Sequence, residues 1–315
     1  MSINRVSSGF LTDQAIFHVN TNQLLMSRLQ ERLASGQNIN QPSDDPVGLT
    51  RILSLSNTLK TDERFARNIE QATAEVNTSD TVMNNVTDLI HRAKELGVQG
   101  ATFTNNQNGR DGIALEIDEI INQMVQLGNT AISGKFLFAG MRTSTTPFNR
   151  IGDDVTYAGT PATEDFGRPA EISRGVEVDI NINGENLLGQ ASLATSIPPV
   201  FNPGSGGVFR TLIELKLNLE QGDTDEVRLR LDELDTDLNN VLAQQARVGS
   251  VSNRLNLTAN RLQEREAIFT QQYASIQDID MAATIADLNQ QESTFQASLA
   301  VTARAIQPSL LNFLR

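Results

Sequence analysis

The hydrophobic positions in the last third of the chain recur at alternating spacings of three and four residues. The series runs from Val227 to Ile276, and twelve of its fifteen members are apolar, whereas only 39% of the whole chain is hydrophobic. Gly249 is the only Gly or Pro in this span. The pattern predicts one continuous helix, roughly 75–80 Å long at ~1.5 Å rise per residue, that lies against another long helix.

A second apolar series follows a break at residues 278–280 and continues to the end of the sequence. Chain ends are usually frayed and polar, so an apolar end predicts a partner. A helix at residues 12–34, ended by Gly36 as a C-terminal cap, offers matching apolar positions at the other end of the chain. We predict an assembly interface made of Leu25, Leu29, Leu33, Ile285, Leu288, Phe295, Leu299, Ile306, Leu310, Leu311 and Phe313.

The first third of the chain contains a second long helical segment. Asp45 followed by Pro46 is a helix start, because Asp accepts hydrogen bonds at the N-cap and Pro has a preset φ. The helix is predicted to run to about Leu96 and to end at Gly97 and Gly100. Apolar residues between positions 113 and 127 predict a further helix.

The hydrophobic pattern changes in the middle of the chain. Val176, Val178, Ile180 and Ile182 alternate with polar residues, which predicts a strand with one buried face. The Asn183-Gly184 pair predicts a turn after it. Together with its Gly and Pro content, this pattern makes residues 136–207 a β-rich insert between helical flanks.

The predicted fold is mainly α, an elongated rod of long antiparallel coiled-coil helices from both chain ends with a small β-rich insert domain. The first and last thirds can pair only if the chain runs out along the rod and returns. We therefore divide the chain into three parts: terminal assembly helices at 1–45 plus 277–315, a helical rod domain at 46–135 plus 208–276, and an outer domain at 136–207.

Composition and charge exclude several classes of partner. The chain has 25 Lys and Arg against 38 Asp and Glu, a formal net charge of −13, and no basic block. Neither nucleic acid nor an anionic membrane surface is therefore expected as a partner. No stretch approaches about eighteen consecutive apolar residues, so no membrane span is expected, and the N-terminus lacks the apolar core of a cleavable signal.

No catalytic, cofactor-binding or metal-binding motif emerges. The absence of Cys rules out disulfides and thiolate metal ligands. Gly134-Lys135 follows Gly128 at a spacing one residue too long for a phosphate-binding loop. His18 and His91 lie in separate helical segments without Cys or His partners for zinc. The sequence predicts a protein that is not an enzyme and needs no cofactor.

Several segments carry a resemblance to a known family. Arg32–Asn40 and Asp44–Leu49 resemble the N-terminal signature of bacterial flagellins and their relatives, and Arg247–Arg254 and Leu310–Arg315 are similar to flagellin near the other end. Flagellins usually carry Ala at the position of Pro46. Residues 42–48 and 134–140 instead resemble the branch of the family that joins the flagellar hook to the filament.

The resemblance implies a structural adaptor that forms the junction ring of the bacterial flagellum. In this family the terminal segments are disordered in the free subunit and pair as helices on assembly. The implied partners are the first hook-associated protein on the hook side, flagellin on the filament side, further copies of the chain in the ring, and an export chaperone. The implied location is extracellular, reached through type III export without a cleaved signal peptide.

Two alternatives remain at this point. The chain resembles flagellin in both terminal thirds, so it could be the filament subunit, and a variable insert does not decide between the two. A cytoplasmic coiled-coil adaptor is the other alternative. Uninterrupted heptads would be expected there, and the β-rich segment speaks against it.

Overall fold

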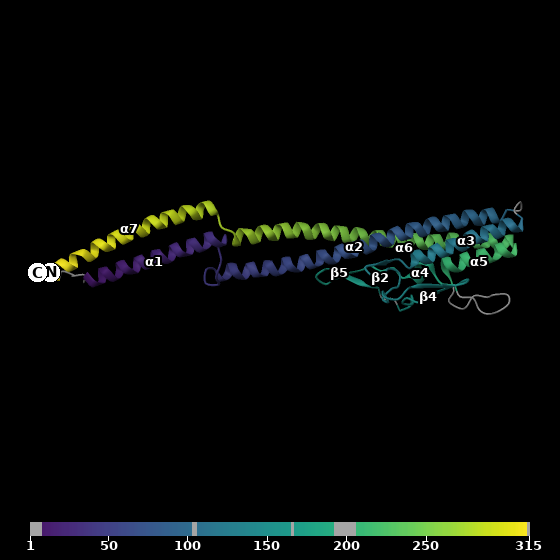
Figure 1. Cartoon of the computed structure of the whole chain (residues 1–315), viewed down its shortest axis with the longest axis horizontal. Helices are drawn as coiled ribbons and strands as arrows, with labels where there is room; N and C mark the ends of the chain where they lie inside the picture. Colours follow the sequence, from purple (N-terminus) through teal and green to yellow (C-terminus); the bar gives the residue numbers. More distant parts are fainter. Residues whose placement is uncertain (1–7, 103–105, 165–166, 192–205, 314–315) are drawn as a thin grey trace. The chain divides into compact units, whose positions relative to one another are not determined.

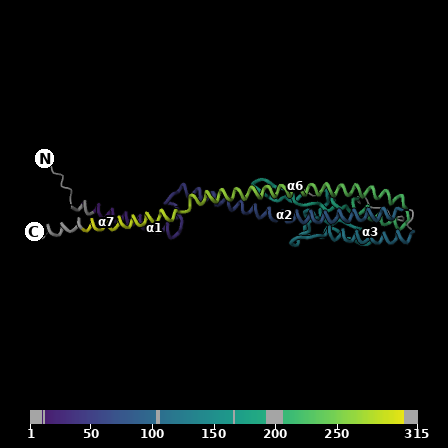
Figure 2. The backbone as a smooth tube through the Cα atoms, turned by 90° about the horizontal axis from the view of Figure 1, so that it is seen from above, coloured from purple at the N-terminus to yellow at the C-terminus, as the bar shows by residue number. Residues whose placement is uncertain are grey.

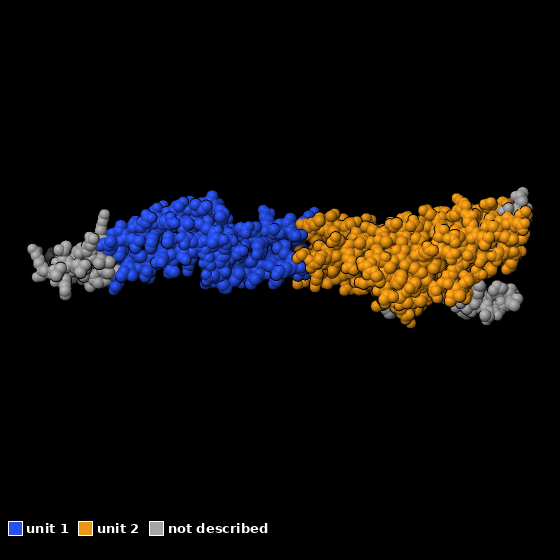
Figure 3. Space-filling view, in the orientation of Figure 1, with its two compact units in different colours: residues 1–61, 264–315 blue, residues 62–263 orange. Residues whose placement is uncertain are grey.

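The chain folds into two compact units, which Figure 3 distinguishes by colour. The computed structural model describes residues 8–102, 106–164, 167–191 and 206–313. Unit 1 comprises Met1–Thr61 and Glu264–Arg315, and unit 2 comprises Asp62–Gln263. The long helices α2 (Pro46–Gly100) and α6 (Thr224–Gln277) contribute residues to both units, whereas α1 (Ser8–Ser35) and α7 (Met281–Phe313) belong to unit 1 (Figure 1).

Four helical segments build most of unit 2. The parts of α2 and α6 in this unit run antiparallel, because Lys94 forms an ion pair with Asp235 while the Gln245 side chain donates to Asn84 Oδ1 at 2.9 Å. The helices α3 (Gln107–Gly128) and α5 (Gly207–Gln221) pack against each other beside them. Long paired helices from both ends of the chain were predicted, and the structure confirms them.

The heptad series of α6 forms the buried side of that helix within unit 2. Every predicted member from Val227 to Leu262 is buried or half-buried, and Val227, Leu234 and Leu255 are fully covered. The residues between them are mostly exposed and polar. The three–four spacing was therefore a correct guide to the buried face, as expected for an amphipathic helix.

Gly97 and Gly100 serve helix packing, and only Gly100 ends α2. The helix passes through Gly97, where an added Cβ would lie 2.7 Å from the Leu231 side chain. At Gly100 it would overlap the side chain of Leu219, which is fully buried. The prediction that both glycines close the helix was wrong for Gly97, because close approach of neighbouring side chains requires Gly there.

Replacing Gly100 by Ala is expected to destabilise unit 2 by about 1–3 kcal/mol, since overpacking a filled site forces neighbours to shift. Gly249→Ala is the matched control, because its Cβ would meet nothing within 4 Å. In the middle of α6 that change should stabilise by about 0.5–1 kcal/mol through helix propensity. Urea unfolding of the two variants measures whether each change raises or lowers the free energy of unfolding. A Gly100→Ala variant more stable than the wild type would contradict the packing argument.

The insert consists of three short antiparallel hairpins and one short helix among the described residues. The hairpins pair β1 (Ala131–Ile132) with β2 (Lys135–Phe136), β3 (Phe148–Ile151) with β4 (Asp154–Tyr157), and β5 (Pro169–Ser173) with β6 (Val176–Asp179). The helix α4 spans Gly184–Leu188. The prediction of a small β-rich insert is confirmed, although its first strand, β1, lies before residue 136, where the insert was predicted to begin.

The end of β6 differs from the prediction. The strand ends at Asp179, although Ile180 and Ile182 continue the alternation in the sequence. Asn183 and Gly184 make no hairpin turn. Asn183 is instead the N-cap of α4, where its Oδ1 accepts from the backbone N of Glu185 at 2.9 Å. An Asn side chain satisfies free N–H groups at a helix start as readily as it favours a turn.

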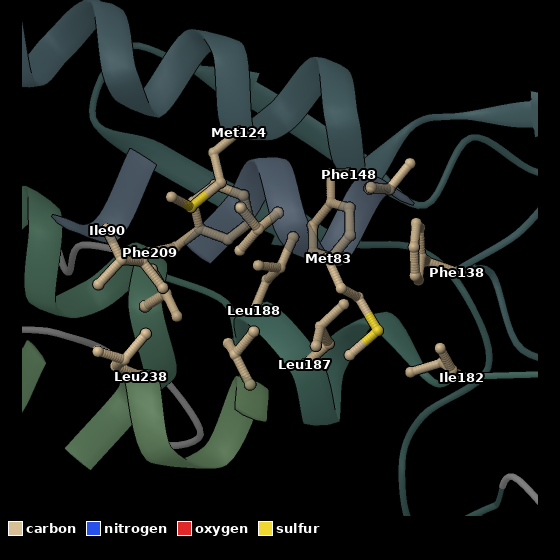
Figure 4. Close-up of a cluster of buried hydrophobic side chains, with 14 of the residues drawn as sticks. Met83, Ile90, Met124, Phe138, Phe148, Ile182, Leu187, Leu188, Phe209 and Leu238 are labelled. Atoms are coloured by element: carbon tan, nitrogen blue, oxygen red, sulfur yellow. The ribbon is translucent and has the colours of Figure 1, made fainter. Parts of the chain in front are cut away.

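A continuous hydrophobic core joins the insert to the helices of unit 2 (Figure 4). Phe138 and Phe148 from the insert and Phe209 from α5 are all essentially inaccessible to solvent. The Phe148 and Phe209 ring centroids are 5.2 Å apart in a tilted arrangement. The insert therefore shares one core with the helices.

A cluster of charged side chains also fastens the β3–β4 hairpin to the helices. Lys216 of α5 contacts Asp118 of α3 at 2.9 Å and Asp153 at 2.6 Å, while Arg150 of β3 pairs with Asp118 at 2.5 Å. Burial alone would raise the pKa of Asp118, but hydrogen bonds from Lys216 and Arg150 outweigh it, and the pKa lies below its ordinary value. The cluster is thus held in its ionised form.

Candidate functional site

The helices α1 and α7 form an antiparallel pair within unit 1 (Figures 1 and 2). Their polar contacts centre on Asn22 of α1. Its Nδ2 donates to Ser298 Oγ at 2.7 Å, and Gln291 Nε2 donates to Asn22 Oδ1 at 3.2 Å. No ion pair connects the two helices among the side chains that the structure describes. Apolar contact and a few neutral hydrogen bonds therefore hold the pair together.

The segment that follows α1 and the segment that precedes α7 are hydrogen-bonded to each other. The Asn38 backbone N donates to the Gln277 carbonyl at 2.7 Å, and the Ile279 N donates to the Gly36 carbonyl at 3.3 Å. The Gln277 side chain donates to the Ile39 carbonyl at 3.3 Å, and both of these residues are buried. These bonds hold the end of α1 beside the start of α7.

The predicted helix start at Pro46 is confirmed. Asp45 Oδ1 accepts from the backbone N of Val47 at 3.0 Å and of Gly48 at 2.8 Å. The neighbouring Asp44 accepts from the backbone of the preceding loop. Both carboxylates therefore satisfy backbone donors.

The α1–α7 pair leaves large apolar side chains exposed. None of its described side chains reaches the degree of burial found in unit 2, because two helices alone can cover only one stripe of each other. The exposed large apolar residues of the pair are Phe10, Ile16, Phe17, Leu24, Leu25, Met281, Ile285, Leu299 and Val301. A surface of this kind marks an interaction site.

The predicted interface residues fall into three groups. Leu29, Leu33, Leu288 and Phe295 are half-buried, as expected for side chains on the faces where the two helices meet. Leu25, Ile285 and Leu299 are exposed and are available to a partner. Ile306, Leu310, Leu311 and Phe313 lie outside the residues whose side chains the structure describes.

The three most exposed large apolar residues of α1 were missing from the predicted interface. Phe10, Phe17 and Leu24 are more exposed than Leu25, which was predicted. Their spacing of seven residues is visible in the sequence and places them on one line along the helix. The prediction missed them because it followed the stripe that faces α7.

The described residues offer little for other chemistry. They contain no group of three or more His, Cys, Asp or Glu side chains placed to hold a metal ion. In the same part of the chain, no helix combines the length and hydropathy that a membrane crossing requires. What the α1–α7 pair can do is associate through apolar surface.

Two family models match the chain. The bacterial flagellin N-terminal helical region matches residues 6–143, and the bacterial flagellin C-terminal helical region matches residues 231–314. Together the two matches include α1, α2, α3 and α7 and most of α6. They leave out most of the insert and α5.

Individual relatives agree with this result. The chain is 25% identical over 305 residues to flagellar hook-associated protein 3 of Escherichia coli, covering 93% of this chain and 94% of the relative. It is 24% identical over 314 residues to a flagellin of Bacillus subtilis, covering 96% of each.

Solved structures share the fold. A putative flagellar hook-associated protein from Vibrio parahaemolyticus superimposes with a TM-score of 0.63 at 20% identity, covering 75% of this chain and 100% of that one. The flagellar hook-associated protein-3 of Legionella pneumophila gives a TM-score of 0.60 at 14% identity, covering 71% and 98%.

Proposed function

The chain belongs to the bacterial flagellin family, and we propose that it is the structural adaptor subunit that forms the junction ring between the flagellar hook and the filament. The resemblance of residues 42–48 and 134–140 to the junction branch of the family supports this proposal. So does the similarity to hook-associated protein 3, which extends over 93% of the chain.

The observation that carries the proposal is the apolar surface that the α1–α7 pair leaves uncovered in a chain of this family. A pair of isolated amphipathic helices is marginally stable in water, since helices in proteins are stabilised mainly by packing of their apolar faces. Neighbouring subunits would supply the missing contacts. Polymerisation through these helices therefore explains why apolar residues remain exposed in a single copy.

We assign a separate task to each part of the chain. Residues 1–45 and 277–315 order on assembly and form the interface that includes Leu29, Leu288 and Phe295. Residues 46–135 and 208–276 form the rod domain, which folds before assembly because its heptad series is already covered. Residues 136–207 form the outer domain. The contrast in burial between α1–α7 and unit 2 supports this division.

The proposed partners follow from the position of the ring between the flagellar hook and the filament. One face of the ring contacts the first hook-associated protein, and the other contacts flagellin. Export proceeds unfolded through the flagellar type III machine, without a cleaved signal peptide, to an extracellular position. A chaperone that covers the C-terminal apolar series before export would prevent premature association of exposed residues such as Leu299 and Val301.

Deletion of the gene tests the proposal directly. We expect cells with complete hooks, no filaments, and flagellin monomer released into the medium, because exported flagellin finds no junction on which to polymerise. Electron microscopy of the cells and an immunoblot for flagellin in the medium measure the two results. Restoring the gene on a plasmid should restore filaments, which controls for effects on neighbouring genes.

The alternative function is the flagellin filament subunit, which the similarity to the Bacillus subtilis flagellin favours. In that case the same deletion would leave hooks without filaments but would also remove this flagellin from the medium. The immunoblot therefore separates the two functions. Normal flagella in the deletion strain would contradict both, and would leave the cytoplasmic coiled-coil adaptor to be tested.

A further inference from the structure

An exposed ridge of large apolar side chains runs along one side of α1. Phe10, Phe17 and Leu24 are 62%, 66% and 64% exposed. Seven residues are almost two full helical turns, so the three side chains lie in a row at intervals of about 10 Å. The Phe17 ring makes an edge contact with the ring of the adjacent His18, with the two centroids 5.9 Å apart.

A groove opens between α1 and α7 on a neighbouring side of the same pair. Its volume is 660 Å³, and small side chains line much of it: Ala15 and Thr21 from α1, and Ala297, Ser298 and Thr302 from α7. Because these side chains are short, the two helices cannot fill the space between them. No Asp, Glu, Lys or Arg lines the groove, so an apolar occupant would enter without displacing an ion pair.

The ridge cannot fill the groove of its own chain. Both features belong to α1, and successive helical residues are rotated by about 100°, so Phe17 lies at the rim of the groove beside Thr21 and is turned away from Ala15 and Asn22. Each copy therefore presents an exposed ridge and, next to it, an open groove. Two different complementary patches on one chain are what a head-to-tail contact between identical subunits requires, and such contacts close into rings or continue as helices.

We infer that the ridge Phe10, Phe17 and Leu24 of one copy inserts into the α1–α7 groove of the next copy, and that this contact repeats around the ring. The inference rests on the proposed function, because it needs several copies assembled side by side. The occupant of the groove is a second copy of the chain, because each copy carries both the apolar ridge and the groove that can receive it. No Asp, Glu, Lys or Arg belongs to the ridge or lines the groove, so no charge opposes the contact.

Disulfide trapping in assembled flagella tests the pairing, since the chain has no Cys. The deletion strain would produce two forms of the full-length protein at once: Phe17→Cys on the ridge, and an epitope-tagged Ala297→Cys in the groove. Mild oxidation should give a covalent dimer that contains one tagged and one untagged chain. Homodimers of either form should be absent, because ridge meets groove and never another ridge. The matched control pairs Gln23→Cys with Gln296→Cys, both exposed on the same two helices, and should give no dimer.

The outcomes separate this inference from the proposed function. Filaments on cells that carry both Cys forms before oxidation show that the variants assemble. Homodimers of Phe17→Cys, or no covalent dimer in such cells, would overturn the ridge-and-groove contact while leaving the junction function intact. Should the Phe17→Cys form fail to assemble, Leu24→Cys with Thr21→Cys gives the same test at another pair of ridge and groove positions. Failure of the gene deletion to remove filaments would instead overturn the proposed function itself.

Discussion

A subunit that carries both Leu288→Asp and Phe295→Asp is expected to reach the cell exterior without entering the flagellum, so that hooks remain without filaments. Both side chains are half-buried on the side of α7 that meets α1. Full burial of a Leu or Phe is worth ~1.5–3 kcal/mol, so removing two half-buried side chains takes away roughly 1.5–3 kcal/mol of apolar contact in every copy. Placing two carboxylates in that contact adds a desolvation penalty.

The matched control carries the same charges on the exposed positions of the same helix, Gln290→Asp and Gln296→Asp. It should assemble normally. Electron microscopy shows the hooks, and an immunoblot of the medium shows whether each subunit was exported. Thermal unfolding of the purified proteins should be the same for both, because α7 lies outside unit 2. Complete filaments on cells with the Leu288→Asp/Phe295→Asp subunit would show that the α1–α7 pair is dispensable for assembly.

The long helices could be predicted because their heptad patterns are strong and local. A series such as Val227 to Leu262 repeats one signal many times, so single polar members like Gln245 and Ser252 do not obscure it. The exact ends were harder. Gly often ends helices, but Gly97 lies inside α2 and allows close contact with Leu231. Only the three-dimensional structure shows that Leu231 is its neighbour.

The insert shows where local pattern stops being informative. Asn183-Gly184 fits a hairpin turn in the sequence, yet Asn183 caps α4, a helix of 5 residues that is too short to leave a periodic apolar pattern in the sequence. The charged cluster around Lys216 could not be predicted either. Its partners Asp118 and Asp153 come from distant parts of the chain, and ordinary spacing rules do not connect them.

The candidate site was predicted in part, for a physical reason. The stripe of α1 that includes Leu29 and Leu33 follows the usual amphipathic spacing, so the sequence identifies it. The ridge that includes Phe10 and Phe17 lies on another side of the helix, and within one chain nothing covers it. A helix that must contact partners on two sides carries two overlapping apolar patterns, and the stronger one hides the other.

Phe148 lies where the insert meets the helices in their joint core. It is 1% exposed, and its ring centroid lies 5.3 Å from that of Tyr157 and 5.2 Å from that of Phe209. Its backbone N donates to Asn129 Oδ1 at 2.9 Å, and Asn129 Nδ2 donates back to its carbonyl at 2.8 Å. A Cβ at Gly128 would lie 2.6 Å from the ring, so the site is shaped around Phe.

Phe148→Ala is therefore expected to destabilise unit 2 by about 3–5 kcal/mol, the cost of removing a large aromatic ring from a filled core. For a unit of this size, the midpoint of thermal unfolding should fall by roughly 10 °C. Ile151→Ala is the control in the same strand: its side chain is 73% exposed, and the change should stay within about 0.5 kcal/mol. Urea unfolding followed by far-UV circular dichroism measures both variants.

If the insert shares its core with the helices, the unfolding midpoint of the helical signal must fall in Phe148→Ala, because α3 and α5 lose the ring that lies between them and the insert. A helical transition that stays at the wild-type midpoint would show that the insert unfolds separately and contributes nothing to the stability of the helices.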